Sequence, residues 1–235
     1  MRLQDKLKEL IPLWREEKRE TLENLGKKKI SDVTVDQAFG GMRGIKGMIC
    51  DTSVVDPDKG LIIRGHPLLS IKDMSPEEVL FLLLTGDIPD KEETESLHRD
   101  LSERGDVPDY VWDILRSMPA NSHPMCMLNT AILSMECESK FRKRYTEGIA
   151  KEDYWIPMLE DSLRILGVLP GIAAGMYRIR YEKGSLIPHN KQLDWSSNYV
   201  NMLGIEDSKG NFAKLIRLYL MFHCDHEGGN VSANT

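Results

Sequence analysis

The side chains best suited to chemistry lie at residues 223–229, where the sequence reads HCDHEGG. Its two histidines, His223 and His226, can donate or accept a hydrogen bond near neutral pH, so they suit a carboxylate or carbonyl ligand. The glycine pair lets the backbone turn sharply and lets a ligand approach it closely. Asn230 and Ser232 follow with neutral hydrogen-bonding groups. The pattern predicts a binding site at the end of the apolar helix that precedes it.

Two other interpretations fit the same residues. The cluster also resembles a polar helix end whose side chains cap the last turn. The HxxH spacing with flanking acids resembles part of a zinc site, although the HExxH order and a clear third ligand are missing. The spacing alone leaves these alternatives open.

The rest of the chain predicts a mainly helical protein with one short β-hairpin near residues 48–64. Apolar residues recur at helical spacing from Leu3 until the pattern fades near Gly26. Residues 48–55 and 61–64 have strand character and flank the turn sequence DPDKG. Later helices are expected at residues 76–85, 91–104, 110–118, 124–135, 140–148, 154–181 and 212–223.

Some local signals are specific enough to fix helix boundaries. Ser75 followed by Pro76 and, three residues after the serine, Glu78 is typical of a capped helix start. Asp90, followed by a glutamate three residues later, predicts a second capped helix start. Pro170 predicts a break or kink in the helix at 154–181. The small residues that follow this proline predict a close approach of other helices.

The remaining histidines favour structural roles. His123 precedes Pro124 and is expected to order a helix start. His66 and His98 are expected to be exposed, and His189 to lie in a polar loop. We find no internal repeat and no convincing domain boundary; the best candidate, residues 184–192, reads as a loop.

Length and composition fit an ordinary globular protein. The 235 residues are 41% hydrophobic and 29% charged, with a formal net charge of −6. The basic residues form no block, so neither nucleic acid nor an anionic membrane is an expected partner. No apolar run approaches the roughly 20 residues that a membrane helix needs. An acidic N-terminus argues against a secretory signal or transit peptide, and predicts a cytoplasmic protein or a processed mitochondrial matrix chain.

The cysteines suggest reduced thiols. None of the four, Cys50, Cys126, Cys137 and Cys224, forms a CxxC pair, and their spacing indicates neither a disulfide framework nor a zinc cage. We therefore expect no resident metal.

Several segments together resemble citrate synthases of the type found in mitochondria and some bacteria. They run in family order along essentially the whole chain. The matching segments are GGMRG at 40–44, TSVVDPD at 52–58, RG at 64–65, HPM at 123–125, EG at 147–148, YW at 154–155, LDWS at 193–196, NMLG at 201–204, and RLYL through HEGGNVSA at 217–233.

The resemblance implies a nearly all-α, homodimeric acyltransferase of the tricarboxylic acid cycle that needs no cofactor beyond its substrate acetyl-CoA. Such an enzyme condenses acetyl-CoA with oxaloacetate and hydrolyses the citryl thioester to citrate and CoA. Residues 1–235 would be the N-terminal part of the family's large helical domain, with the small domain and the C-terminal part absent. An alternative within the same chemistry is 2-methylcitrate synthase, and an alternative of another class is a non-catalytic helical protein retained for binding or assembly.

The resemblance also implies roles for individual residues. His226 would bind oxaloacetate or citrate by donating a hydrogen bond, without transferring a proton. Ser232 would support an enol-stabilising histidine, and Asn230 matches a structural asparagine. Arg43 matches an arginine that meets CoA phosphates, which a planar guanidinium suits. Lys151 stands where the family often has a second such arginine, and it keeps the charge but loses the bidentate geometry.

The main departure from the family is length. In family order the catalytic aspartate, both later catalytic histidines and the arginines that clamp the substrate carboxylates lie beyond Thr235. We therefore expect no catalytic residue in this chain and no activity from it alone. Helices of the missing part would cover residues 170–181 and 215–222, so we expect these apolar faces to be exposed.

Overall fold

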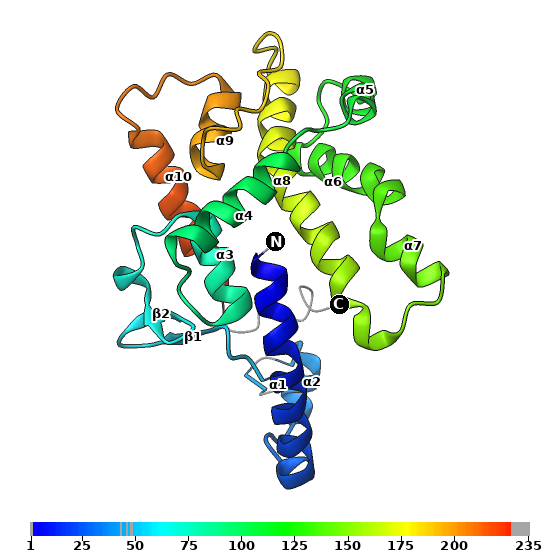
Figure 1. Cartoon of the computed structure of the whole chain (residues 1–235), viewed down its shortest axis with the longest axis vertical. Helices are drawn as coiled ribbons and strands as arrows, with labels where there is room; N and C mark the ends of the chain where they lie inside the picture. Colours follow the sequence, from blue (N-terminus) through cyan, green and yellow to red (C-terminus); the bar gives the residue numbers. More distant parts are fainter. Residues whose placement is uncertain (1, 43, 46, 48, 227–235) are drawn as a thin grey trace.

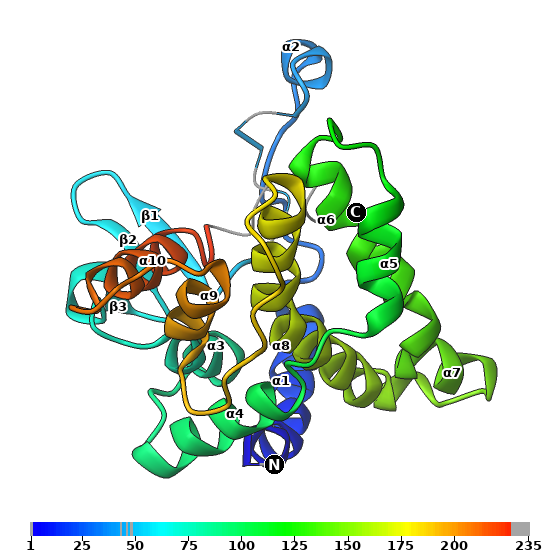
Figure 2. The ribbon, with the colours of Figure 1, turned by 90° about the horizontal axis from the view of Figure 1, so that it is seen from above.

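The protein is built from helices packed around one long central helix, α8 (Trp155–Arg180) (Figure 1). This computed structural model describes residues 2–42, 44–45, 47 and 49–226. Figure 2 shows α9 and α10 on one side of α8, and α5, α6 and α7 on the other. The predicted fold class, mainly α with a small hairpin, is confirmed.

The element boundaries follow the sequence pattern closely. The two predicted capping boxes are present at Ser75 and Asp90. His123 begins its helix as expected, because its Nδ1 accepts a hydrogen bond from the backbone N–H of Met125 at 3.2 Å. The other elements are α1 (Arg2–Leu25), α2 (Val35–Phe39), β1 (Ser53–Asp56), β2 (Gly60–Ile63), β3 (His66–Pro67), α3 (Pro76–Thr85), α4 (Lys91–Glu103), α5 (Asp109–Ser117), α6 (Pro124–Ser134), α7 (Lys140–Thr146), α9 (Trp195–Leu203) and α10 (Asn211–Phe222).

The hairpin forms where the turn sequence predicts it. Strands β1 and β2 pair antiparallel with Ser53 opposite Ile63. The Asp56 carboxylate closes the turn by accepting hydrogen bonds from the backbone N–H groups of Asp58 and Lys59, both at 2.9 Å. The sequence did not predict β3, a two-residue strand that adds to the edge of β2. The result is a small three-stranded sheet that covers one end of α3.

Only the first part of α1 is anchored in the protein. Leu3 and Leu7 are buried against Phe81 of α3 and Leu163 of α8. Farther along, α1 extends away from the body of the protein (Figure 1). Leucines there are more than half exposed, at positions 13, 22 and 25.

The second half of α8 is more completely covered than we expected. Ile172 packs against Val111 of α5 and Met127 of α6, and Ala174 packs against Met202 of α9. Of the predicted break or kink at Pro170, the break does not occur, because α8 runs without interruption from Trp155 to Arg180, and Pro170 is itself buried. A proline inside a helix costs about 3 kcal/mol or more, and packing on both sides of α8 offsets that cost. The prediction of an exposed face at 170–181 is therefore wrong for residues 170–175, which are largely buried, and residues 176–180 are half-buried. Tyr181 is exposed, and so are Leu215, Tyr219 and Phe222 of α10, as predicted.

Small residues allow α8 to approach its neighbours closely. A Cβ added at Gly167 would lie 2.8 Å from the backbone oxygen of Leu101 in α4. A Cβ at Gly175 would lie 2.4 Å from the ring of Trp112 in α5. Both distances are shorter than a van der Waals contact, so the predicted close helix approach is confirmed. No described helix combines the length and the apolarity that crossing a membrane requires.

The close approach of α4 and α8 gives a direct test. Gly167→Ala should lower the free energy of unfolding by about 1–3 kcal/mol, the usual cost of overpacking, although alanine favours a helix more than glycine does. Urea unfolding followed by circular dichroism measures the change. Ser162→Ala, on the exposed side of the same helix, should leave the stability within about 0.5 kcal/mol. A Gly167→Ala protein as stable as the wild type would contradict the tight packing.

Candidate functional site

Helix α10 carries the predicted ligand-binding segment at its C-terminal end. Asp207 stabilises the start of the helix, because its carboxylate accepts hydrogen bonds from the backbone N–H groups of Phe212 and Ala213 at 3.1 and 2.8 Å. These bonds favour the charged carboxylate and lower the pKa of Asp207. The helix ends at Phe222, and His223 follows as its C-cap.

The two histidines of the motif have different surroundings. The ring of His223 stacks on Tyr219 with centroids 4.2 Å apart, and its Nδ1–H donates to the backbone oxygen of the same tyrosine at 2.7 Å. His223 is thus tied to its own helix. His226 is exposed.

The end of α10 is held against the hairpin and α3. Met221 is buried among Ile63 of β2 and Val79 and Leu82 of α3, and Cys224 packs against the same group. Burial raises the pKa of the Cys224 thiol. These contacts fix the position from which the chain leaves α10 toward His226.

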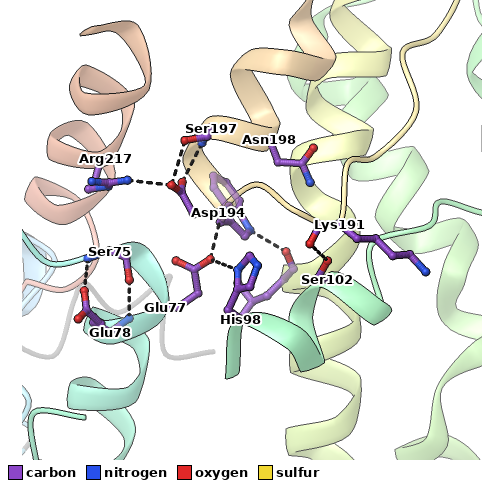
Figure 3. Close-up of polar contacts among 12 residues, drawn as sticks. Ser75, Glu77, Glu78, His98, Ser102, Lys191, Asp194, Ser197, Asn198 and Arg217 are labelled. Atoms are coloured by element: carbon purple, nitrogen blue, oxygen red, sulfur yellow. Dashed lines mark hydrogen bonds and ion pairs between the residues drawn. The ribbon is translucent and has the colours of Figure 1, made fainter. Parts of the chain in front are cut away.

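A polar network fixes the middle of α10. Arg217 donates from Nη2 to Oδ2 of Asp194 at 2.9 Å. Asp194 is also the N-cap of α9, because its Oδ1 accepts from the backbone N–H of Ser197 at 2.9 Å. One carboxylate therefore caps one helix and forms an ion pair with another (Figure 3).

Glu77 connects this network to α3 and α4. Its side chain is only 3% exposed. Oε1 accepts from the backbone N–H of Trp195 at 3.0 Å and lies 3.3 Å from Nδ1 of His98 on α4 (Figure 3). The indole N–H of Trp195 in turn donates to the backbone oxygen of Leu166 in α8 at 2.9 Å. The carboxylate raises the pKa of His98, because it stabilises the imidazolium form.

A cavity of about 270 Å³ lies between α3, α8, α9 and α10. Its wall is mainly apolar and includes Leu83, Leu166 and Leu220. Glu77 and Arg217 also border it, and each has a buried polar atom, Oε2 and Nε respectively, without a hydrogen-bond partner in the described part of the chain. His223 reaches the edge of this cavity, but His226 is not among the residues that line it.

The described residues hold two of the five predicted site residues. His226 follows α10, and Lys151 is exposed in a short 3₁₀ turn before α8. The two residues belong to separate elements, and no hydrogen bond or ion pair joins them in the described part of the chain. The other three predicted site residues, Arg43, Asn230 and Ser232, lie outside the described residues.

Sequence reasoning missed the polar residues that organise the site. His98 was expected to be exposed, but Glu77 and the loop before α9 cover most of it. Glu77 reads in the sequence as an ordinary acid in a first helical turn. The one usable signal was Asp194 with Ser197, a good N-cap pair that would have predicted α9.

The comparison with known protein families decides the identity. The family model "Citrate synthase, C-terminal domain" matches residues 41–235. The chain belongs to the citrate synthase family.

Curated citrate synthases align along almost the whole chain. The peroxisomal citrate synthase of Saccharomyces cerevisiae is 41% identical over 243 residues, which cover 99% of this chain and 52% of the relative. Citrate synthase 4, mitochondrial, of Arabidopsis thaliana is 39% identical over 246 residues, covering 99% of this chain and 51% of the relative. The chain spans about half the length of the curated relatives it matches.

A solved citrate synthase structure shows the same fold. The enzyme from Pyrobaculum aerophilum aligns with a TM-score of 0.69 and 24% identity, covering 77% of this chain and 45% of that one. The helical arrangement seen here is therefore that of part of the citrate synthase fold.

The double role of Asp194 can be separated by mutation. Asp194→Ala removes both the cap of α9 and the pair with Arg217, and should lower the free energy of unfolding by about 1–2.5 kcal/mol. Asp194→Asn keeps a good cap and loses only the charge, so it should cost about 0.5–1 kcal/mol.

Urea denaturation of the two variants measures the difference. Asp90→Ala, which removes a cap from α4, is the matched control and should cost about 0.5–2 kcal/mol. Equal losses for the alanine and asparagine variants at Asp194 would contradict a capping role.

Proposed function

We propose that this chain forms the N-terminal part of a citrate synthase large helical domain and contributes to the oxaloacetate site of that enzyme. The reaction would be the condensation of acetyl-CoA with oxaloacetate, followed by hydrolysis of the thioester to citrate and CoA. The observation that supports it most is the alignment of 99% of the chain with curated citrate synthases at about 40% identity. We propose a homodimer as the assembly of the complete enzyme.

His226 is the residue that we propose for oxaloacetate binding. It leaves a helix whose position is fixed by Met221 in the core and by Arg217 on Asp194. An exposed imidazole on a fixed base can donate a hydrogen bond to a carboxylate or carbonyl oxygen of a four-carbon diacid without large rearrangement. Asn230 and Ser232 would support groups in the part of the enzyme that this chain lacks.

We propose the basic residues Arg43 and Lys151 for binding CoA. Lys151 is exposed beside the start of α8, so its ammonium group is accessible to a phosphate. The substrate supplies the acyl group, and we propose no further cofactor and no metal. For location we propose the cytoplasm, or the mitochondrial matrix for a processed chain; the names of the relatives place them in mitochondria and peroxisomes.

The 235-residue chain by itself should not turn over substrate. Mixing it with acetyl-CoA and oxaloacetate should release no thiol above background, because the family's proton-transfer groups are not among its residues. A thiol-reactive dye measures release. Turnover by the pure chain would contradict this assignment of roles.

Joining residues 1–235 to the remaining half of the peroxisomal relative from S. cerevisiae should give an active enzyme. In this chimera, His226→Ala should raise the KM for oxaloacetate roughly 10- to 150-fold, since a hydrogen bond to a charged ligand is worth about 1.5–3 kcal/mol. Steady-state kinetics with varied oxaloacetate measures the effect.

His66→Ala is the control and should leave the KM unchanged. An unchanged KM in the His226→Ala enzyme would refute the binding role. A preference of the intact enzyme, with its own second half, for propionyl-CoA over acetyl-CoA would favour a 2-methylcitrate synthase instead.

A further inference from the structure

Two histidines from distant parts of the chain border one small cavity. His98 lies on α4, and His189 lies in the α8–α9 loop (residues 181–194). The cavity between them holds about 20 Å³ and is also lined by Glu77 and Asn198. Nothing in the proposed reaction uses these residues, yet the hydrogen bonds of His189 fix its protonation state and the neighbours of His98 favour its charged form.

His98 is surrounded by groups that favour its charged form. Its Nδ1 lies 3.3 Å from Oε1 of Glu77, and the backbone of Lys191 forms a second hydrogen bond with the ring. The carboxylate of Asp194 acts in the same direction. Together these groups raise the pKa of His98, with the hydrogen bond to Glu77 as the largest cause.

His189 is held in its neutral form by the orientation of Asn198. The backbone N–H of Asn190 donates to Oδ1 of Asn198 at 3.1 Å, which fixes that atom as the amide oxygen. The amide nitrogen, Nδ2, must then be the atom that faces Nδ1 of His189 at 2.9 Å. An amide nitrogen can only donate here, so Nδ1 of His189 must accept and carries no proton. Its Nε2–H is then free to donate to Oγ of Ser102 at 3.2 Å.

Adding a proton to His189 would break this arrangement. The new N–H on Nδ1 would face the N–H of Asn198, so two donors would meet with no acceptor between them. Burial lowers the pKa of His189, and the neighbouring His98 and Lys191 charges act in the same direction, whereas Asp106 opposes them. The neutral form is therefore the one that the folded protein prefers.

We propose that His98 and His189 form a two-sided pH clamp on the α8–α9 loop, closed when His98 is protonated and His189 is neutral. Acid opens it by protonating His189, which separates the loop from Asn198 on α9. Base opens it by deprotonating His98, which removes the positive charge that faces the buried Glu77 carboxylate and weakens its hold on the N-terminus of α9.

The signs of the two effects are opposite. The pKa of His98 is raised, so its stabilising contribution is present below about 6.5, the ordinary histidine value, and is lost as the pH rises through the folded-state pKa. The pKa of His189 is lowered, so its contribution is present above about 6.5 and is lost as the pH falls through the folded-state pKa. The loop is therefore held most firmly between the two folded-state pKa values.

Two backbone amides report separately on the two halves of the proposed clamp, one beside His189 and one beside His98. The amide of Asn190 donates to Asn198 beside His189, and the amide of Trp195 donates to Glu77 beside His98. Hydrogen exchange of the full 235-residue chain, measured by NMR from pH 5 to pH 9 and corrected for intrinsic exchange rates, gives the protection of each amide. We expect the Asn190 amide to lose protection about threefold or more toward pH 5, and the Trp195 amide to lose a similar factor toward pH 9.

Single substitutions should remove either the acid-side or the alkaline-side pH dependence of amide protection and leave the other in place. His189→Gln, a neutral side chain that can still accept and donate, should abolish the acid-side loss at Asn190 and keep the alkaline loss at Trp195. His98→Gln should do the reverse, and Glu77→Gln should behave like His98→Gln. His66→Gln in β3 is the control and should change neither. Amides of α6, which lies on the far side of α8, should show no such pH dependence.

The wild-type protein also offers a test that needs no variant to fold. In imidazole NMR titrations, His98 should titrate above the ordinary histidine value of about 6.5, and His189 below it. Equal titration of these two rings, protection at Asn190 and Trp195 that is flat with pH, or losses that α6 shares in full would each overturn the clamp.

Discussion

The buried carboxylate of Glu77 is the constraint on which the arrangement of α3, α4 and α9 depends. An isolated carboxylate is expensive to bury, so it requires partners that stabilise its charge. The structure supplies them through the backbone N–H of Trp195 and the ring of His98. Removing either partner leaves a charge in an apolar setting, so three helices can move only together.

This constraint extends to the proposed ligand site through Asp194. Its carboxylate starts α9 one residue before the backbone N–H that Glu77 holds, and it binds Arg217 on α10. The exit of the chain toward His226 is thus set by a chain of polar contacts that begins on α3. Apolar packing around Met221 supports the same end of the helix. Precise placement of an exposed imidazole therefore depends on residues that never approach the ligand.

Local signals predicted most of the fold, and long-range contacts explain what they missed. Capping boxes at Ser75 and Asp90 and the turn before Gly60 depend on residues within four positions of each other, so the sequence displays them directly. Glu77 meets His98 across 21 residues and Trp195 across 118, and no local pattern encodes either contact. The helix also continues through Pro170, whose neighbours Ile172 and Ala174 pack against α5, α6 and α9 in long-range contacts that no local pattern encodes. Within the site, the resemblance to citrate synthases pointed to His226 and Lys151, but it gave no sign of the buried Glu77 that links α3 to α4 and α9.

The position of α8 along the chain has a consequence for how the protein is made. Helices α1, α3, α4, α5 and α6 all precede α8 in the chain, yet they bury apolar side chains against this helix, which leaves the ribosome only afterwards. Synthesis proceeds at about 5–20 residues per second, so α1, α3, α4, α5 and α6 emerge several seconds before their common partner. During that interval their leucines and methionines remain exposed to chaperones and to other nascent chains. Slow translation of the codons for residues 155–180 would lengthen this period, whereas synonymous codons that speed this stretch would shorten it.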